Sequence, residues 1–173
     1  MDTAAKSERA PGANETTVER ASERELVVRR TISGPARVVF EAWTRPELFE
    51  RWWVPKSFPA SLISCEMDVR VGGGYKLVFD SEGSTAEFFG RYLEVTPPAR
   101  LVWTNDEGDG GGPVTTVTFE DQGDRTLLTI HDLYPSKEAL DAESSSGSTS
   151  AMPETLAQLD ELVIGLGSSA VRG

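Results

Sequence analysis

Residues 35–53 read PARVVFEAWTRPELFERWW, and this stretch holds two short helical patterns in immediate succession. In the first pattern Val39, Phe40 and Trp43 fall on one helical face, at positions i, i+1 and i+4. Pro46 suits the first turn of the second helix, and no Gly-rich linker separates the two patterns. We therefore expect a compact pair of short helices here.

The second helix runs into two adjacent tryptophans, Trp52 and Trp53. Neighbouring helical residues point about 100° apart, so the two indoles cannot enter one pocket by the same route. We expect one of them to lie in the core and the other at the corner between helix and loop. Three roles stay open for the pair: packing, lining the mouth of a cavity, and forming a surface for a partner.

Strand patterns flank the helices on both sides. One strand lies in RELVVRRTISG at residues 24–34, and six strand-like segments follow the helices. Gly, Pro and Asp turn residues separate these segments at short intervals, which is typical of an antiparallel meander. The six segments are SLISCEMDVRV (61–71), YKLVFDS (75–81), TAEFFGRYLEV (85–95), RLVWTND (100–106), PVTTVTFED (113–121) and RTLLTIHDL (125–133).

A longer helix is predicted near the C-terminal end of the chain, with Gly167 at its exit. Its apolar residues step by four, three, four and three, so they form one narrow stripe. The opposite face carries the polar residues Gln158, Asp160 and Glu161. The stripe consists of Met152, Leu156, Leu159, Val163 and Leu166.

These elements assign a single domain to residues 24–168. Residues 1–23 are polar and show no sustained period, so we predict a disordered N-terminal tail there, and residues 169–173 form a C-terminal tail. The Ser-rich segment at residues 136–150 interrupts the strand pattern and is expected to be mobile.

The order of elements is one strand, two short helices, six strands and one long helix. A seven-stranded antiparallel sheet has one face to cover, and the C-terminal helix is the only large element able to cover it. We therefore predict an α+β helix-grip fold. In it a curved seven-stranded antiparallel sheet wraps around the long C-terminal helix, and the two short helices follow strand 1. A curved sheet and a straight helix close imperfectly, so we expect a cavity between them.

Four phrases of the sequence also carry a family resemblance. They are ARVVFEAWTRPELFERWW (36–53), CEMDVRVGGGYKL (65–77), FFGRYLEVTPPARLVWTN (88–105) and LAQLDELV (156–163). In this order they resemble the SRPBCC, or START-like, superfamily, over residues 24–168. Within it they resemble the branch of heat-shock-protein-90 ATPase activator homologues, in its stand-alone bacterial form. The resemblance implies a helix-grip domain, and members of the superfamily include carriers of hydrophobic ligands, cyclases, toxin-resistance proteins and co-chaperone domains.

Charge and composition narrow the classes of partner. The formal charge of −11 disfavours nucleic acid and anionic membrane surfaces. No apolar run reaches the roughly 20 residues that a bilayer span needs, and the first residues lack the apolar core of a signal peptide, so we expect a cytoplasmic protein. Cys65 and His131 are the only residues of their types, too few N and S ligands for a zinc site, and we expect neither metal nor cofactor.

The candidate ligand-binding residues are apolar side chains that we expect to face the cavity. Tyr75, Leu77 and Phe79 share one face of their strand because they alternate with other residues. The inward parity of residues 85–95 and 113–121 stays open, since either parity contains apolar side chains. The full set is Trp53, Met67, Tyr75, Leu77, Phe79, Trp103, Leu156, Leu159 and Val163.

Acid–base chemistry would require a titratable side chain inside the cavity. Histidine is the side chain that ordinarily titrates near neutral pH, so His131 is the one weak catalytic candidate. Asp132 is its neighbour in the strand and would point to the opposite face. Glu66 and Asp68 share a strand face with Arg70, and we interpret them as solvated charges.

The leading hypothesis is non-enzymatic binding of a small hydrophobic or aromatic ligand in a cavity between the sheet and the C-terminal helix. One alternative, implied by the resemblance alone, is a co-chaperone-like protein-interaction domain similar to the activators of the heat-shock-protein-90 ATPase. A second alternative is a cyclase or hydrolase on the same scaffold. The expected partners are a small hydrophobic ligand or a chaperone, and the expected state is a monomer or a weak dimer.

Overall fold

A computed structural model describes residues 15–54, 56–57, 60–106, 112–146 and 151–172 of the chain. Within them eight strands form one antiparallel sheet in the order β1-β2-β8-β7-β6-β5-β4-β3. The strands are β1 (Thr16–Arg20), β2 (Glu25–Ile32), β3 (Ser61–Met67), β4 (Gly74–Ser81), β5 (Ser84–Thr96), β6 (Arg100–Thr104), β7 (Val114–Asp121) and β8 (Thr126–Leu133). The helices are α2 (Ala36–Thr44), α3 (Pro46–Phe49), α4 (Lys137–Ser146) and α5 (Met152–Arg172).

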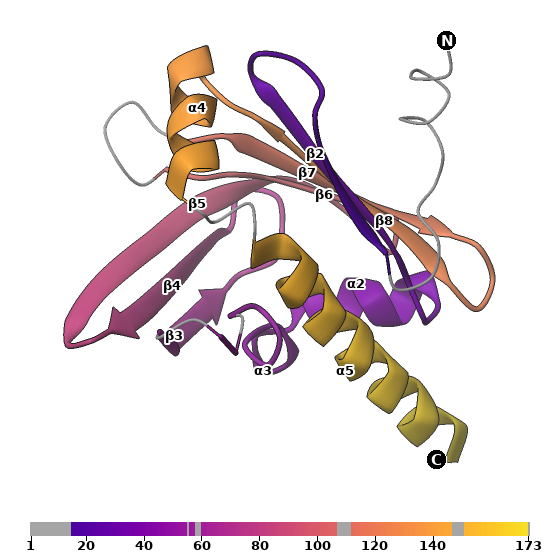
Figure 1. Cartoon of the computed structure of the whole chain (residues 1–173). Coiled ribbons are helices and arrows are strands. Elements are labelled where there is room, and N and C mark those ends of the chain that lie inside the picture. Colours follow the sequence, from indigo (N-terminus) through magenta and orange to yellow (C-terminus); the bar gives the residue numbers. More distant parts are fainter. Residues whose placement is uncertain (1–14, 55, 58–59, 107–111, 147–150, 173) are drawn as a thin grey trace, which may run out of the picture.

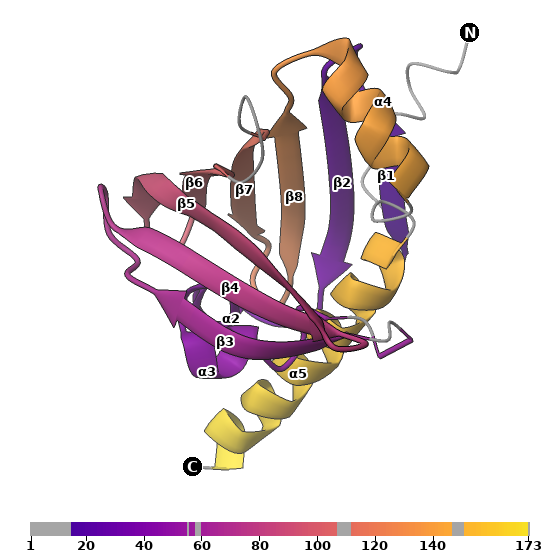
Figure 2. The ribbon, with the colours of Figure 1, turned by 90° about the vertical axis from the view of Figure 1, so that its left-hand side faces the viewer.

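The predicted helix-grip architecture is confirmed. The two short helices α2 and α3 follow β2, and α5 lies with α2 on one side of the sheet (Figure 1). Strands β3, β4 and β5 form a wing that runs across β6, β7 and β8 (Figure 2). The sheet therefore has a concave face, which holds the helices, and a convex face, which lies outside.

The core fills the space between the concave face and the helices. Val28, Ile130, Val117 and Leu101 lie opposite one another on four neighbouring strands and are all buried. The α5 residues of the same cluster have no exposed surface, and burying each such side chain contributes about 1.5–3 kcal/mol to folding. These helix residues are Leu156, Leu159 and Val163.

The strand β1 is an eighth strand where seven were predicted, and it lies within the segment assigned to the disordered tail. Thr16–Arg20 pairs antiparallel with β2, and Val18, its central residue, is 40% exposed. An edge strand of this kind buries little apolar surface, so its sequence lacks the strong alternation that marks the other strands. The remaining tail residues, 1–14, lie outside the described residues.

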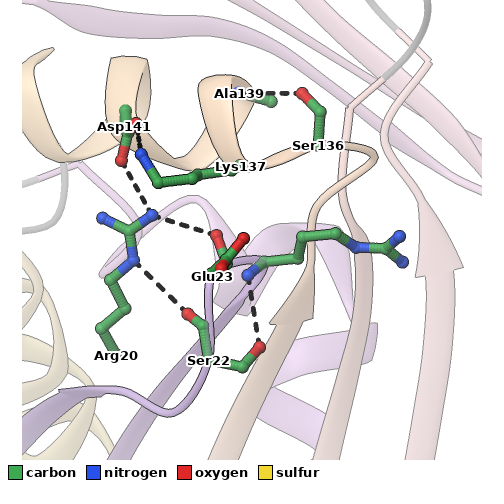
Figure 3. A network of polar contacts seen from close by, with 8 residues as sticks. Arg20, Ser22, Glu23, Ser136, Lys137, Ala139 and Asp141 are labelled. Atoms are coloured by element: carbon green, nitrogen blue, oxygen red, sulfur yellow. Dashed lines mark hydrogen bonds and ion pairs between the residues drawn. The ribbon is translucent and has the colours of Figure 1, made fainter.

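Helix α4 corrects the prediction that residues 136–150 are mobile, as far as Ser146. Leu140 has no exposed surface and packs against Leu26 and Tyr134. Figure 3 shows the polar contacts that hold the helix: Asp141 pairs with Lys137 and with Arg20 of β1. A single buried leucine in ten mostly polar residues gives a weak amphipathic signal, and contacts from other elements are needed to fix such a helix.

The polar face of α5 does not lie entirely in solvent. Asp160 is 3% exposed and forms an ion pair with the buried Arg30 at 3.1 Å. The Ser33 amide donates to the other Asp160 oxygen at 2.9 Å. Gln158 donates from Nε2 to the carbonyls of Trp52 and Val54, so it fastens α5 to the chain after α3.

Helix α5 also extends to Arg172, beyond the predicted end at Gly167 and through most of the predicted C-terminal tail. Among the described residues no helix is both long enough and apolar enough to cross a bilayer.

Candidate functional site

Strand register decides which side chains reach the concave face. Residues directly opposite in antiparallel strands lie on the same face. Met67 lies opposite Tyr75 and Cys65 opposite Leu77, so the predicted inward parity of β4 is confirmed. For the two strands whose inward-facing residues were left open by the sequence, the register decides. The inward residues are Phe88, Gly90 and Tyr92 of β5 and Thr115, Val117 and Phe119 of β7.

The predicted ligand-binding residues divide into two groups by burial. The members on α5 and Leu77 on β4 are buried, and they pack in the core. The other five are half-buried and pack against the same core from its rim. These five are Trp53, Met67, Tyr75, Phe79 and Trp103.

The two adjacent tryptophans take the two different positions expected for them. Trp52 is fully buried and donates from Nε1 to the Ala42 carbonyl at 3.0 Å. Trp53 is half-buried and stacks on Phe49 with ring centroids 4.8 Å apart. Trp43 contacts both of them, and it contacts Trp103 at 5.8 Å. A continuous aromatic cluster therefore leads from α3 to the concave face of β6.

A hollow of about 340 Å³ lies where the end of β3 meets the start of β4. Inward-facing Met67 and Tyr75 line it together with Glu66 and Lys76, which face outward. A second hollow, of about 400 Å³, lies between β1 and α5 next to Arg30 and outside the core. Neither hollow is lined by the buried stripe of α5, so the two hollows lie beside the core and not within it.

A row of hydrogen-bonded polar side chains crosses the concave face from Tyr75 to Asp132. The Tyr75 hydroxyl lies 2.8 Å from Asn105 Oδ1 and 3.0 Å from the Thr104 carbonyl. Asn105 Nδ2 donates to Thr115 Oγ1 at 3.0 Å, and the Thr115 hydroxyl donates to Asp132. We call these four residues, Tyr75, Asn105, Thr115 and Asp132, the polar row.

Gly90 makes room for the start of the polar row. A Cβ atom at this position would collide with the Thr104 carbonyl and crowd the Tyr75 ring. The absence of a side chain lets β5 approach β6 closely and lets Tyr75 lie over Gly90, its partner across the strands. The tyrosine hydroxyl can thus reach the end of β6.

Burial perturbs the carboxyl group at the other end of the row. Desolvation raises the pKa of Asp132 from 3.8 to about 6, against the hydrogen bond from Thr115, while Glu143 of α4 acts in the same direction as burial. Asp132 shares its parity with the buried Leu128 and Ile130, so the sequence did contain a signal for it. An inward carboxylate in an apolar strand is the pattern that sequence reasoning passed over.

The remaining titratable candidates lie apart from the polar row. His131 faces the convex side, where its Nε2 lies 2.8 Å from Glu25 Oε2. Burial raises the pKa of the Cys65 thiol to about 11, so little reactive thiolate forms at neutral pH. Asp68 and Arg70 pair with each other at 2.9 Å and are exposed, as the interpretation of solvated charges predicted.

Comparison with known proteins places the chain in a family. A family model described as activator of Hsp90 ATPase homolog 1-like protein matches residues 33–163. A solved structure from Nitrosomonas europaea is 26% identical, with a TM-score of 0.77, over 86% of this chain and 99% of that one. One from Chromobacterium violaceum is 28% identical, with a TM-score of 0.67, over 82% of this chain and 98% of that one.

A third solved structure, from Rhodobacter sphaeroides, is 24% identical, with a TM-score of 0.80, over 88% of this chain and 99% of that one. At that identity the likeness shows the fold alone. No curated protein matches the sequence. Both the helix-grip topology and the matched family model lead to one conclusion: the chain belongs to the family of activator of Hsp90 ATPase homolog 1-like proteins.

Proposed function

We propose that the protein binds a small hydrophobic or aromatic ligand on its concave face, without enzymatic chemistry. The ligand contacts the five half-buried residues at the rim, Trp53, Met67, Tyr75, Phe79 and Trp103. Leu77 and the α5 residues Leu156, Leu159 and Val163 form the buried wall behind them.

One observation carries this proposal: large apolar side chains gather at the rim of a filled core and remain half-buried there. Met67 and Tyr75 in addition line a hollow, whose volume of about 340 Å³ is at the lower end of the range for small-molecule sites. Aromatic rings at such a rim offer large contact areas to an aromatic ligand.

Fluorescence titration with N-phenyl-1-naphthylamine, a neutral aromatic probe, tests the proposal. We expect saturable binding to the wild-type protein and a loss of about fivefold or more in affinity for Tyr75→Trp, because the larger ring fills the hollow. Phe89→Trp is the matched control, since Phe89 lies on the opposite face of the same wing and should leave affinity unchanged. Absence of saturable binding to the folded wild type would refute ligand binding by this face.

A second candidate function, a co-chaperone-like interaction domain, is supported by exposed apolar side chains on the wing. Phe89 and Leu93 of β5 are 39% and 50% exposed, and Val71 in the turn between β3 and β4 is 64% exposed. The Gly72 amide donates to the Tyr92 carbonyl, which brings that turn next to β5. If this surface binds the cognate Hsp90, Phe89→Ala with Leu93→Ala will abolish stimulation of its ATPase, while Tyr75→Trp will not.

A further inference from the structure

We infer that the ligand of this face carries a positively charged amino group, which pairs with Asp132 while the aromatic part of the ligand lies against Trp103. This inference rests on the proposed ligand binding and assigns a chemical class to the ligand. It concerns a carboxylate that the sequence reasoning did not include among the candidate site residues.

The Asp132 carboxylate has fewer hydrogen-bond donors than it can accept. Within the described part of the chain, Thr115 is its one hydrogen-bond donor, and that bond reaches a single oxygen, Oδ1. An ionised carboxylate accepts at two oxygens and has about four lone-pair sites. The second oxygen, Oδ2, accepts no hydrogen bond from the described residues and, because Asp132 is half-buried, can be reached by a donor from outside.

The direction of the hydrogen bonds keeps Asp132 an acceptor. The Pro113 carbonyl receives a bond from Asn105 Nδ2 at 2.7 Å, and this contact fixes the orientation of the Asn105 amide. The same amide nitrogen donates to Thr115 Oγ1, so the hydroxyl hydrogen of Thr115 turns towards Asp132. The polar row thus delivers a donor to the carboxylate and favours its ionised form.

The charges around Asp132 do not neutralise it. Glu143 of α4 adds a second negative charge, and on the neighbouring strands the opposite residues are uncharged, Thr115 of β7 and Leu26 of β2. Within the described residues no lysine or arginine forms an ion pair with Asp132, and His131 of the same strand points to the convex face. A cationic ligand would supply the missing positive charge.

Asp160, a second inward-facing carboxylate, has a hydrogen-bond donor at each of its oxygens. Asp160 pairs with Arg30 at one oxygen and accepts the Ser33 amide at the other. Both Asp160 oxygens thus have donors, one of them cationic, whereas Asp132 has one neutral donor. Asp132 can therefore accept a further hydrogen bond or ion pair, whereas Asp160 already has a donor at each oxygen.

An aromatic surface lies two strands from the carboxylate, in the same cross-strand row. Thr115 is opposite Asp132 on one side and opposite Trp103 on the other, and Tyr92 lies opposite Trp103. Trp103 is half-buried and contacts the Tyr92 ring at 6.3 Å. Aromatic faces attract cations as well as other rings, so an aromatic amine matches both halves of this row.

Calorimetric titration with three compounds of similar shape separates charge from shape: 1-naphthylmethylamine, 1-naphthylmethanol and 1-naphthoate. Near pH 8 we expect the wild type to bind the amine about tenfold more tightly than the alcohol, and the anion most weakly. Asp132→Asn should reduce affinity for the amine to that for the alcohol and leave the alcohol unchanged. Glu25→Gln, which changes an acidic residue on the convex face, is the matched control and should preserve the preference.

A direct measurement covers the case in which the variant is poorly folded. In the wild type, carboxyl NMR titration of Asp132 should show its pKa falling when 1-naphthylmethylamine is bound, because the ammonium stabilises the ionised form. Equal affinities for amine and alcohol would overturn the inference and leave ligand binding intact. Failure of all three compounds and of N-phenyl-1-naphthylamine to bind would overturn both.

Discussion

Two inward-facing carboxylates, the buried Asp160 and the half-buried Asp132, mark regions of different character. Asp160 lies where α5 meets β1 and β2 and is buried next to its ion-pair partner Arg30, which is also buried. Asp132 is half-buried on the concave face near α4, two strands from the half-buried Trp103, and no cation of the described residues pairs with it. We call the first region the clasp and the second the open end. The contrast shows that one inward-facing carboxylate fixes the helix through an ion pair, whereas the other keeps an oxygen without a donor among the described residues.

The largest effect is expected in the clasp, from Asp160→Asn. This change leaves the Arg30 charge buried without its counter-ion, and breaking a buried ion pair in this way costs about 4 kcal/mol of unfolding free energy. Urea denaturation at neutral pH measures the loss. The double variant Arg30→Met with Asp160→Leu removes both charges and should regain more than half of it. An unchanged stability for the single variant would contradict the structural role of the clasp.

Packing gives the next largest difference, between the core and its rim. Leu159→Ala removes a core side chain with no exposed surface and should cost about 3 kcal/mol. Met67→Ala at the rim removes a half-buried side chain of similar size and should cost about 1 kcal/mol. Parallel denaturation curves test this ordering. Equal losses would show that the rim is packed as firmly as the core.

A further effect has the opposite sign and depends on pH. Folding raises the pKa of Asp132 from 3.8 to about 6, so the native state binds this proton more tightly and stability falls as pH rises between those values. Above about pH 6 the native state carries the full cost, and Asp132→Asn should then stabilise the protein by about 2 kcal/mol. Near pH 4 the gain should vanish. Thermal unfolding across this range measures it, and a gain independent of pH would show that the charge is not its cause.

Asp160→Asn and Asp132→Asn test the difference between the two regions directly, because the same change removes one negative charge at each site. We expect a large loss of stability at Asp160 and a modest gain at Asp132. We place ligand recognition at the open end because Asp132 has one neutral donor and no cationic partner there among the described residues.

Much of the fold followed from local pattern. All six strand segments after the helices, the two short helices with Pro46 in a first turn, and the stripe on α5 appear as predicted. Strand β1 and helix α4 escaped prediction because each holds few buried apolar residues, such as Leu140, and is fixed by partners distant in sequence. Four of the five rim residues were named from strand patterns and Trp53 from its place at the corner between helix and loop, but their half-burial depends on the tertiary packing of the wing and the helices.

The sequence by itself determined the periods: alternation in the strands, the apolar stripe of α5 and the separation of Trp52 from Trp53. Only the tertiary structure decided which parity of β5 and β7 faces inward, and that Asp160 lies buried while Asp132 joins the polar row. The physical reason is one of range. A period is set by neighbours along the chain, whereas burial and hydrogen-bond partners are set by register between segments far apart in sequence.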